Sequence, residues 1–255
     1  MSDTPSLTIG RPIGAEHAPF VIAELSANHL GSLERAFAII DAAADAGCDA
    51  LKLQTFTPHA MTIDSARADF HIADGPWEGR SLWDLYDEAH TPWDWHAQLF
   101  ARGAARGLVV FSTPFDELAV EQLDRLGAPA FKIASFELVD LELIACAART
   151  HKPLILSTGM ASDAELGEAI ETARSHGTGG VALLHCVSGY PTPIEQTNLR
   201  RLDAIAALGT VVGISDHSPG AIVPIAAVAR GASIIEKHLT LARADGGPDA
   251  GFSLE

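Results

Sequence analysis

Residues 130–158 read AFKIASFELVDLELIACAARTHKPLILST, and this stretch decides the fold. It begins and ends with short, mostly apolar runs, residues 130–135 and 153–158. Fully buried parallel strands show such continuous apolar runs, whereas half-exposed strands alternate apolar and polar residues. The stretch between the two runs is long enough for a helix. The sequence therefore predicts a parallel strand–helix–strand unit here.

Runs of the same kind recur along the whole chain, with amphipathic helical stretches between them. The eight runs lie at residues 20–25, 50–55, 108–113, 130–135, 153–158, 181–186, 211–215 and 233–238. Eight strand–helix repeats favour a closed (β/α)₈ TIM barrel over an open doubly wound sheet. The chain stops soon after the eighth run without an eighth helix, so we expect a barrel truncated after strand eight.

Capping patterns mark two helix starts. Ser162 with Glu165 three residues later is a full capping box. Thr91, followed by Pro92 and Asp94, resembles a second capped start.

One connection is much longer than the others. Residues 57–90 separate the second and third strands and contain Trp77, Trp83 and Tyr86. A long insertion at the catalytic end of a barrel usually covers the substrate. A packed surface loop is the alternative, and the sequence leaves both open.

The composition narrows the range of partners. The chain has 255 residues and a formal net charge of −16. This charge argues against a nucleic-acid partner, because phosphate backbones require a basic surface. No run of apolar residues is long enough to cross a membrane. The three cysteines suggest neither a disulfide framework nor a zinc ribbon, and they fit a cytoplasmic protein.

Polar residues collect where the predicted strands end, which is where a barrel builds its active site. Lys52 and Lys132 lie inside otherwise apolar strands, and a buried lysine is costly unless it meets an anion or a partner. Several Ser and Thr residues accompany them, which suits a phosphate or a phosphate with a carboxylate. There is no GxxxxGK[ST] loop and no GxGxxG after a strand, so we expect no nucleotide. The strand-end set comprises Glu24, Lys52, Gln54, Ser112, Thr113, Lys132, Ser135, Ser157, Thr158, His185, Ser188, Ser215, Asp216, His217, Glu236, Lys237 and His238.

His217 and His238 end the two last strands, which are neighbours in a barrel. Two neutral imidazoles at that place predict a divalent metal site with positions open for substrate and water. Asp216 and Glu236 are candidates to orient the rings. Taken singly, each histidine is more often a hydrogen-bonded structural residue, and it is the pair on adjacent strand ends that favours a metal. His185 is a further candidate.

These residues form an ordered series that resembles the sialic acid synthase family. The series is Glu24 with Asn28-His29, then KLQTF, FSTPFD, FKIAS, STGM, LLHCVSGYPTP, GISDHS and IEKHLT. Members of this family condense phosphoenolpyruvate with an amino sugar. The segments GRSLWDLYDEAHTPWDWH and RADGGPDAGFSLE are most similar to the pseudaminic acid synthase branch, which uses 2,4-diacetamido-2,4,6-trideoxy-L-altrose. Ser188, where the N-acetylneuraminate branch often has Asn, favours the same branch. Ala27 departs from a Gly common in the family.

The resemblance implies a role for each matched residue. His217 and His238 would bind the divalent metal, Mn²⁺, Mg²⁺ or Co²⁺. Phosphoenolpyruvate would be held by Lys52, Thr113, Lys132, Ser135, Ser157, Ser188 and Ser215. The acetamido sugar or the attacking water would be contacted by Glu24, Gln54, Tyr190 and Asp249. Glu24 is the first candidate for proton transfer, with Glu236 as a substitute.

The resemblance also carries an expectation about domains. Residues 1–255 would form the phosphoenolpyruvate-condensing barrel domain, with a C-terminal antifreeze-like (SAF) domain absent. The full-length form would be a homodimer. The alternatives are an N-acetylneuraminate or legionaminic acid synthase, another barrel enzyme such as a metal-dependent aldolase, and a non-catalytic sugar-binding barrel.

Overall fold

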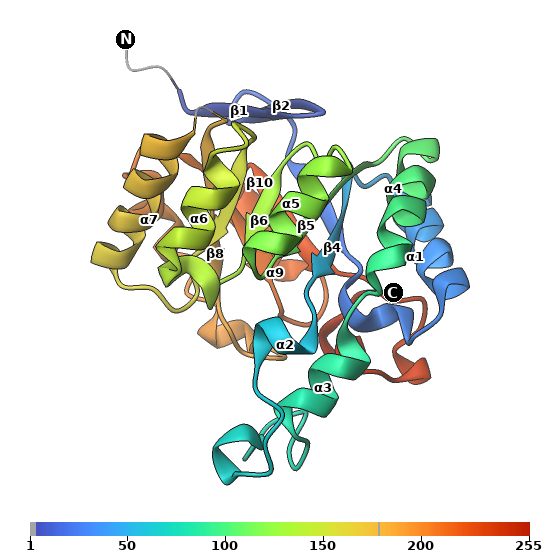
Figure 1. Cartoon of the computed structure of the whole chain (residues 1–255). Helices are drawn as coiled ribbons and strands as arrows, with labels where there is room; N and C mark the ends of the chain where they lie inside the picture. Colours follow the sequence, from blue (N-terminus) through green and yellow to red (C-terminus); the bar gives the residue numbers. More distant parts are fainter. Residues whose placement is uncertain (1–3, 178) are drawn as a thin grey trace.

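A computed structural model describes residues 4–177 and 179–255. Its centre is a closed barrel of eight parallel strands surrounded by helices, so the predicted TIM barrel is confirmed (Figure 1). The barrel strands are β3 (Phe20–Glu24), β4 (Ala50–Thr55), β5 (Val109–Pro114), β6 (Phe131–Ile133), β7 (Leu154–Ser157), β8 (Val181–Cys186), β9 (Val211–Asp216) and β10 (Ile234–His238). Strand β10 pairs with β3 and closes the barrel.

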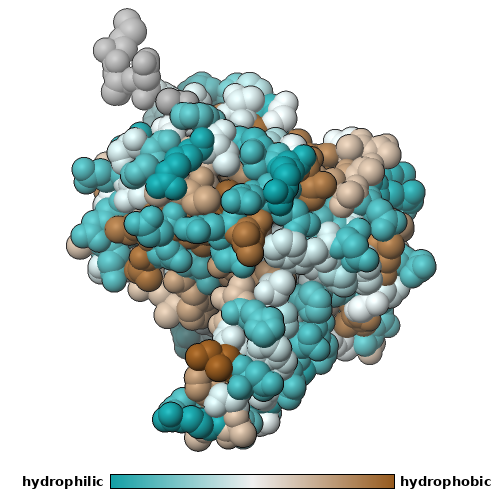
Figure 2. Space-filling model, viewed as in Figure 1, coloured by the Kyte–Doolittle hydropathy of each residue, from teal (hydrophilic) through white to brown (hydrophobic). Residues whose placement is uncertain are grey.

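Helices follow the strands and pack their apolar faces on the outside of the barrel. They are α1 (Leu33–Asp45), α4 (His96–Ala105), α5 (Glu117–Arg125), α6 (Leu141–Ala148), α7 (Asp163–His176), α8 (Arg201–Ala206) and α9 (Ile222–Ala229). The outer surface of this layer is largely hydrophilic on the face drawn in Figure 2, as the high content of acidic residues requires.

The two predicted helix starts have different outcomes. Ser162 and Glu165 form a reciprocal capping box at the start of α7, as predicted. The predicted start at Thr91 is wrong, because a 3₁₀ turn (Trp93–Trp95) comes first and α4 begins at His96. No side chain caps the start of α4, and the His96 Nδ1 donates to the Pro92 carbonyl at 3.1 Å.

An N-terminal hairpin, which the sequence did not reveal, covers one end of the barrel. Strands β1 (Ser6–Ile9) and β2 (Arg11–Gly14) pair in antiparallel fashion. Apolar side chains of the hairpin join the core inside the barrel, in one cluster with Phe20 and Phe111. Figure 1 places the hairpin at the end of the barrel opposite α2 and α3. The active site can therefore open only at the other end.

The insertion between β4 and β5 projects from that other end (Figure 1). It contains α2 (Pro58–Met61) and α3 (Leu82–Ala89). An antiparallel bridge between His71 and Ser81 closes the loop between the two helices.

The segment after β10 returns across the same barrel end in 3₁₀ turns at Arg243–Asp245 and Ala250–Phe252. Asn28 fixes it, because its Nδ2 donates to the Leu239 carbonyl and to Ser253 Oγ, each at 2.9 Å. Across residues 4–177 and 179–255, no helix combines the length and apolarity that crossing a membrane requires.

Candidate active site

A cavity of about 590 Å³ opens at the carboxyl ends of the barrel strands. This volume suits a ligand of small-molecule size. With the exception of Glu24, every residue to which the family resemblance gives a role lines it: Lys52, Gln54, Thr113, Lys132, Ser135, Ser157, Ser188, Tyr190, Ser215, His217, Glu236, His238 and Asp249. The barrel brings these residues together from segments that are far apart in the sequence.

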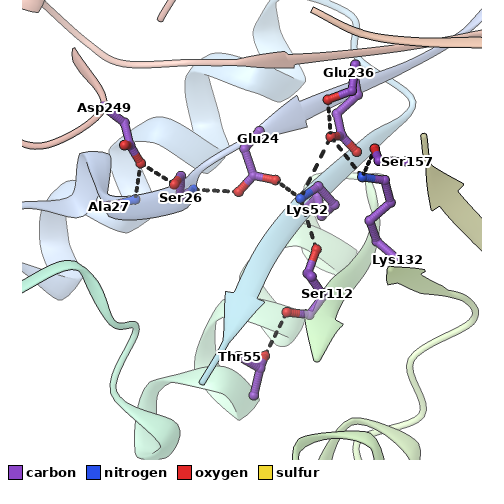
Figure 3. Close-up of polar contacts among 12 residues, drawn as sticks. Glu24, Ser26, Ala27, Lys52, Thr55, Ser112, Lys132, Ser157, Glu236 and Asp249 are labelled. Atoms are coloured by element: carbon purple, nitrogen blue, oxygen red, sulfur yellow. Dashed lines mark hydrogen bonds and ion pairs between the residues drawn. The ribbon is translucent and has the colours of Figure 1, made fainter. Parts of the chain in front are cut away.

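Glu24 lies below the cavity surface and is fully buried. Its carboxylate forms an ion pair with Lys52 and accepts a hydrogen bond from the Ser26 backbone N–H at 2.8 Å. Figure 3 shows that these contacts continue from Asp249 through Ser26, Glu24 and Lys52 to Glu236. Glu24 therefore acts on the cavity through its contacts with Lys52 and Ser26, which both line it.

The two buried lysines share Glu236. Lys132 Nζ lies 3.4 Å from Glu236 Oε1 and donates to Ser157 Oγ at 2.7 Å. Lys52 Nζ lies 3.9 Å from the same carboxylate oxygen. Ser215 Oγ donates to Glu236 Oε1 at 2.8 Å. These contacts explain how two ammonium groups are kept inside the barrel.

Burial and charge set the protonation states of this cluster. Burial raises the pKa of Glu24 to about 7, although the Lys52 ammonium opposes the shift. Burial also opposes ionisation of Glu236, but the Lys132 and Lys52 ammonium groups outweigh it and lower the pKa of Glu236. Burial opposes the charge of Lys52, but the Glu236 and Glu24 carboxylates outweigh it and raise the pKa of Lys52. Burial lowers the pKa of Lys132. These two lysines are the groups on the floor of the cavity that an anion would meet.

Hydroxyl groups meet around Gly159, next to the lysines. The Gly159 backbone N–H donates to Ser135 Oγ at 3.1 Å. A Cβ at this position would lie 2.8 Å from Ser135 Oγ, 2.8 Å from Ser188 Oγ and 3.1 Å from the Cys186 carbonyl. Ser188 Oγ is buried and finds no hydrogen-bond partner in the described part of the chain. These hydroxyls are available to a ligand, and only glycine fits behind them.

The His217 and His238 rings lie side by side, with centroids 5.3 Å apart. Burial lowers the pKa of His217 to about 4 and that of His238 well below its usual value, so both rings are neutral. His217 Nδ1 donates to the Val187 carbonyl at 3.2 Å, which leaves Nε2 with a lone pair. His238 Nδ1 is buried without a hydrogen-bond partner among residues 4–177 and 179–255.

These features fit a site at which two imidazoles hold a divalent ion and other ligands complete its coordination. Within the described residues, no group of three or more His, Cys, Asp or Glu side chains is arranged to hold a metal by itself.

The opposite side of the cavity combines an acid with aromatic rings. The Asp249 carboxylate accepts hydrogen bonds from Ser26 Oγ and, at 3.3 Å, from the Ala27 backbone N–H. Burial raises the pKa of Asp249. The Tyr190 ring packs on His217 at 4.5 Å and on Trp77 of the insertion at 5.8 Å.

Several strand-end residues point away from the cavity. Ser112 bonds to Thr55 at 2.7 Å, and His185 Nε2 bonds to the Thr197 carbonyl at 2.7 Å. Lys237 forms a buried ion pair with Asp216 at 2.6 Å. The predictions that His185 could join the site and that Asp216 could orient a ring are therefore not supported by the contacts seen. Side chains of a strand alternate between its two faces, and these four residues face outward.

The structure also adds residues that the sequence analysis missed. Cys186 lines the cavity, and Phe56 and Phe115 form part of its wall. In the insertion, Trp77 and Tyr86 line the cavity, whereas Trp83 packs on His59 instead. Glu137 lies next to the site in a half-buried position, and burial raises the pKa of its carboxyl to about 7. Glu137 could have been found from the sequence, because it lies two residues after the predicted site residue Ser135.

Comparison with known proteins agrees with this arrangement. The sequence profile of the NeuB family matches residues 39–255. The chain belongs to the NeuB family. The pseudaminic acid synthase of Helicobacter pylori is 44% identical over 238 residues, which is 93% of this chain and 70% of that protein. The pseudaminic acid synthase of Campylobacter jejuni is 44% identical over 237 residues, 92% of this chain and 69% of that protein.

Solved structures of this NeuB-family fold are similar as well. The N-acetylneuraminic acid synthetase of Leptospira borgpetersenii superposes with a TM-score of 0.88 at 32% identity. The match covers 99% of this chain and 84% of that one.

Proposed function

We propose that this chain is a nonulosonic acid synthase of the pseudaminic type. It would condense phosphoenolpyruvate with the open-chain aldehyde of a 2,4-diacetamido-2,4,6-trideoxyhexose and release phosphate. The observation that carries the proposal is the convergence of two buried lysines, several hydroxyls and two neutral imidazoles on one cavity. The 44% identity to pseudaminic acid synthases supports the choice of sugar.

Phosphoenolpyruvate would bind between the lysines and the hydroxyls around Gly159. An ammonium group has three N–H donors, and Lys132 uses two of them on Ser157 and Glu236. One donor therefore remains for the phosphate or carboxylate of the substrate. Ser135 and Ser188 add neutral donors, which fix the orientation of the anion.

The proposed reaction forms one carbon–carbon bond and breaks one carbon–oxygen bond. C3 of phosphoenolpyruvate attacks the aldehyde carbon, whose oxygen takes up a proton. Water then adds to C2 and gives up a proton. The C2–O bond to the phosphate breaks as the C2 hydroxyl becomes the 2-oxo group, and phosphate leaves with the bridging oxygen and the hydroxyl proton. The product is a 2-oxo acid three carbons longer than the sugar.

Glu236 is better placed than Glu24 to take the proton from water. Glu236 lines the cavity, and its Oε2 has no hydrogen-bond partner in the described residues. Its lowered pKa keeps it ionised, as a general base requires. Glu24 is separated from the cavity by Lys52 and would instead tune the charge of that lysine.

We further propose that His217 and His238 hold Mn²⁺, Mg²⁺ or Co²⁺. A bound ion would polarise the aldehyde oxygen of the sugar as a Lewis acid. The chain contributes by keeping both rings neutral and by fixing the tautomer of His217 through the Val187 carbonyl. The double variant His217→Ala/His238→Ala should lose calorimetric Co²⁺ binding and metal-dependent turnover. Undiminished binding would remove the metal assignment.

A phosphate-release assay with a panel of amino sugars tests the function. We expect phosphate release and a product of the matching mass with the 2,4-diacetamido-2,4,6-trideoxyhexose. Preference for N-acetylmannosamine or for the legionaminic precursor would reassign the chain within the family. An aldolase would form a product without releasing phosphate, and a sugar-binding barrel would form none.

We further propose that the enzyme is a homodimer, as the resemblance to the family implies. The net charge of −16 and the three cysteines favour a cytoplasmic enzyme that binds no nucleic acid. Sedimentation of the protein tests the oligomeric state.

A further inference from the structure

The cavity has two chemically different sides. Charged and hydroxyl-bearing residues form its floor, close to the two histidines. The side toward the insertion is mostly apolar, with Asp74 as its charged exception. Its apolar part includes Phe56, Ile72, Leu82, Tyr86 and Phe115, which we call the apolar wall. The Tyr86 hydroxyl is the single polar side-chain atom among these five residues.

The apolar wall is built by direct contacts between the barrel and the insertion. Phe56, at the end of β4, packs edge-to-face on Tyr86 of α3 and on Phe115 after β5, with ring centroids 5.9 Å and 5.2 Å apart. Leu82 and Tyr86 lie one helical turn apart and so share a face of α3. The Ile72 backbone N–H donates to the Arg80 carbonyl at 2.9 Å, which holds Ile72 near the start of α3.

The proposed reaction fixes which end of the sugar reaches this wall. The aldehyde carbon must approach phosphoenolpyruvate at the lysines and histidines on the floor. The far end of the open-chain sugar then extends toward the mouth of the cavity. There, hydroxyl groups find acceptors and donors on the Asp249 and Ser26 side, whereas the apolar wall offers almost none.

We propose that the apolar wall selects the sugar by contacting its C6 methyl group, so that this enzyme discriminates against sugars with a hydroxyl at C6. The inference rests on the proposed synthase function. A hydroxyl placed against this surface would lose its water without gaining an equivalent hydrogen bond. An apolar pocket rejects an analogue with one added hydroxyl by up to roughly 100-fold.

The test compares two sugars that differ in one atom. They are the 2,4-diacetamido-2,4,6-trideoxyhexose and the same sugar with a hydroxyl at C6. We expect kcat/KM to favour the 6-deoxy sugar by about 10- to 100-fold. The Ile72→Asn and Leu82→Gln variants should reduce this preference to less than about threefold and leave the KM for phosphoenolpyruvate unchanged. Both residues belong to the insertion, outside the barrel core.

Ile63→Asn is the matched control, because Ile63 lies in the same insertion but is 66% exposed and does not line the cavity. This variant should keep the full preference. Equal kcat/KM for the two sugars in the unmodified enzyme would overturn the inference while leaving the synthase function intact. A preference that survives in both wall variants would overturn it as well.

Calorimetric binding of the two reduced, open-chain sugar alcohols separates this inference from the synthase function. These ligands cannot react, so the measurement does not depend on turnover. Tighter binding of the 6-deoxy alcohol that is lost in Leu82→Gln supports the wall as a methyl-binding surface. Equal binding of both alcohols contradicts it, whether or not phosphate is released.

Discussion

Replacing Gly159 with alanine tests the anion site with the smallest possible change. The backbone of Gly159 lies outside the left-handed region, so alanine adds no conformational strain. Its new methyl group would lie 2.8 Å from the hydroxyl oxygens of both Ser135 and Ser188. It would also lie 3.1 Å from the Cys186 carbonyl, which belongs to the backbone of the barrel and cannot swing away. The serine hydroxyls must therefore move.

The size of the effect follows from the hydrogen bonds that are lost. A hydrogen bond to a charged group contributes about 1.5–3 kcal/mol. Loss of one such bond from Ser135 or Ser188 weakens binding by about 10- to 150-fold, since about 1.4 kcal/mol corresponds to a factor of ten. We expect the dissociation constant of phosphoenolpyruvate to rise by this factor in Gly159→Ala.

Isothermal titration calorimetry with phosphoenolpyruvate measures this constant directly, at a temperature below the unfolding transition of the variant. Gly167→Ala is the control, because Gly167 lies in the helix that follows the same loop and a Cβ there meets no atom within 4 Å. That variant should bind phosphoenolpyruvate normally and gain about 0.5–1 kcal/mol of stability. An unchanged dissociation constant in folded Gly159→Ala would refute the assignment of Ser135 and Ser188 to the anion.

Three further predictions concern the buried charges. Lys132→Met should raise the KM for phosphoenolpyruvate by at least about 10-fold in the phosphate-release assay, because a charged donor is lost; an unchanged KM would argue against anion binding at this lysine. Burial raises the pKa of Glu24 to about 7, so its contribution to folding is full below its unfolded pKa near 4.5 and is lost as the pH rises through 7. Urea unfolding should therefore show that, between pH 5 and pH 8, the free energy of unfolding of the wild type falls by up to about 3 kcal/mol relative to that of Glu24→Gln. A difference between the two proteins that does not change with pH would contradict this. Lys237→Met should destabilise the fold by about 3–5 kcal/mol, since it leaves Asp216 buried without its partner. The double variant with Asp216→Asn should recover part of that loss in the same urea experiment.

The barrel could be predicted because the same pattern, a short apolar run followed by a helical stretch, recurs along the chain. Each strand is buried on both faces, so its apolar run is visible without knowledge of its neighbours. The hairpin over the other barrel end was missed, because β1 and β2 have four residues each and carry too few apolar positions to stand out. The start of α4 was misplaced for a different reason. Local pattern suggested a cap at Thr91, but the hydrogen bond from His96 to the Pro92 carbonyl depends on the folded structure.

The residues around the cavity were predictable from the strand pattern where they lie in a strand or just after it. Tyr190 and Asp249, which lie farther from the strand ends, were predicted only from the family resemblance. Lys52 and Lys132 stood out because charge is rare in buried strands. The apolar wall was not predictable residue by residue, because Phe56 and Phe115 look like ordinary core residues in the sequence. Their role depends on the path of the insertion, which places Tyr86 against Phe56. Trp83 shows the same limit, since it belongs to the insertion and yet packs on His59.

The alternation of strand residues explains which polar side chains are available for chemistry. In β9, in β10 and directly after β9, the residues that line the cavity are Ser215, His217, Glu236 and His238. Asp216 and Lys237 lie between them and face outward, where they pair with each other. The Lys237 ammonium also donates to the Ser218 carbonyl at 2.5 Å and so ties the turn after β9 to β10. Polar residues at the ends of these strands therefore form two alternating sets. The side chains of one set face the cavity, and those of the other set face outward and link neighbouring strands. Sequence motifs cannot separate the two sets, but the register of each strand does.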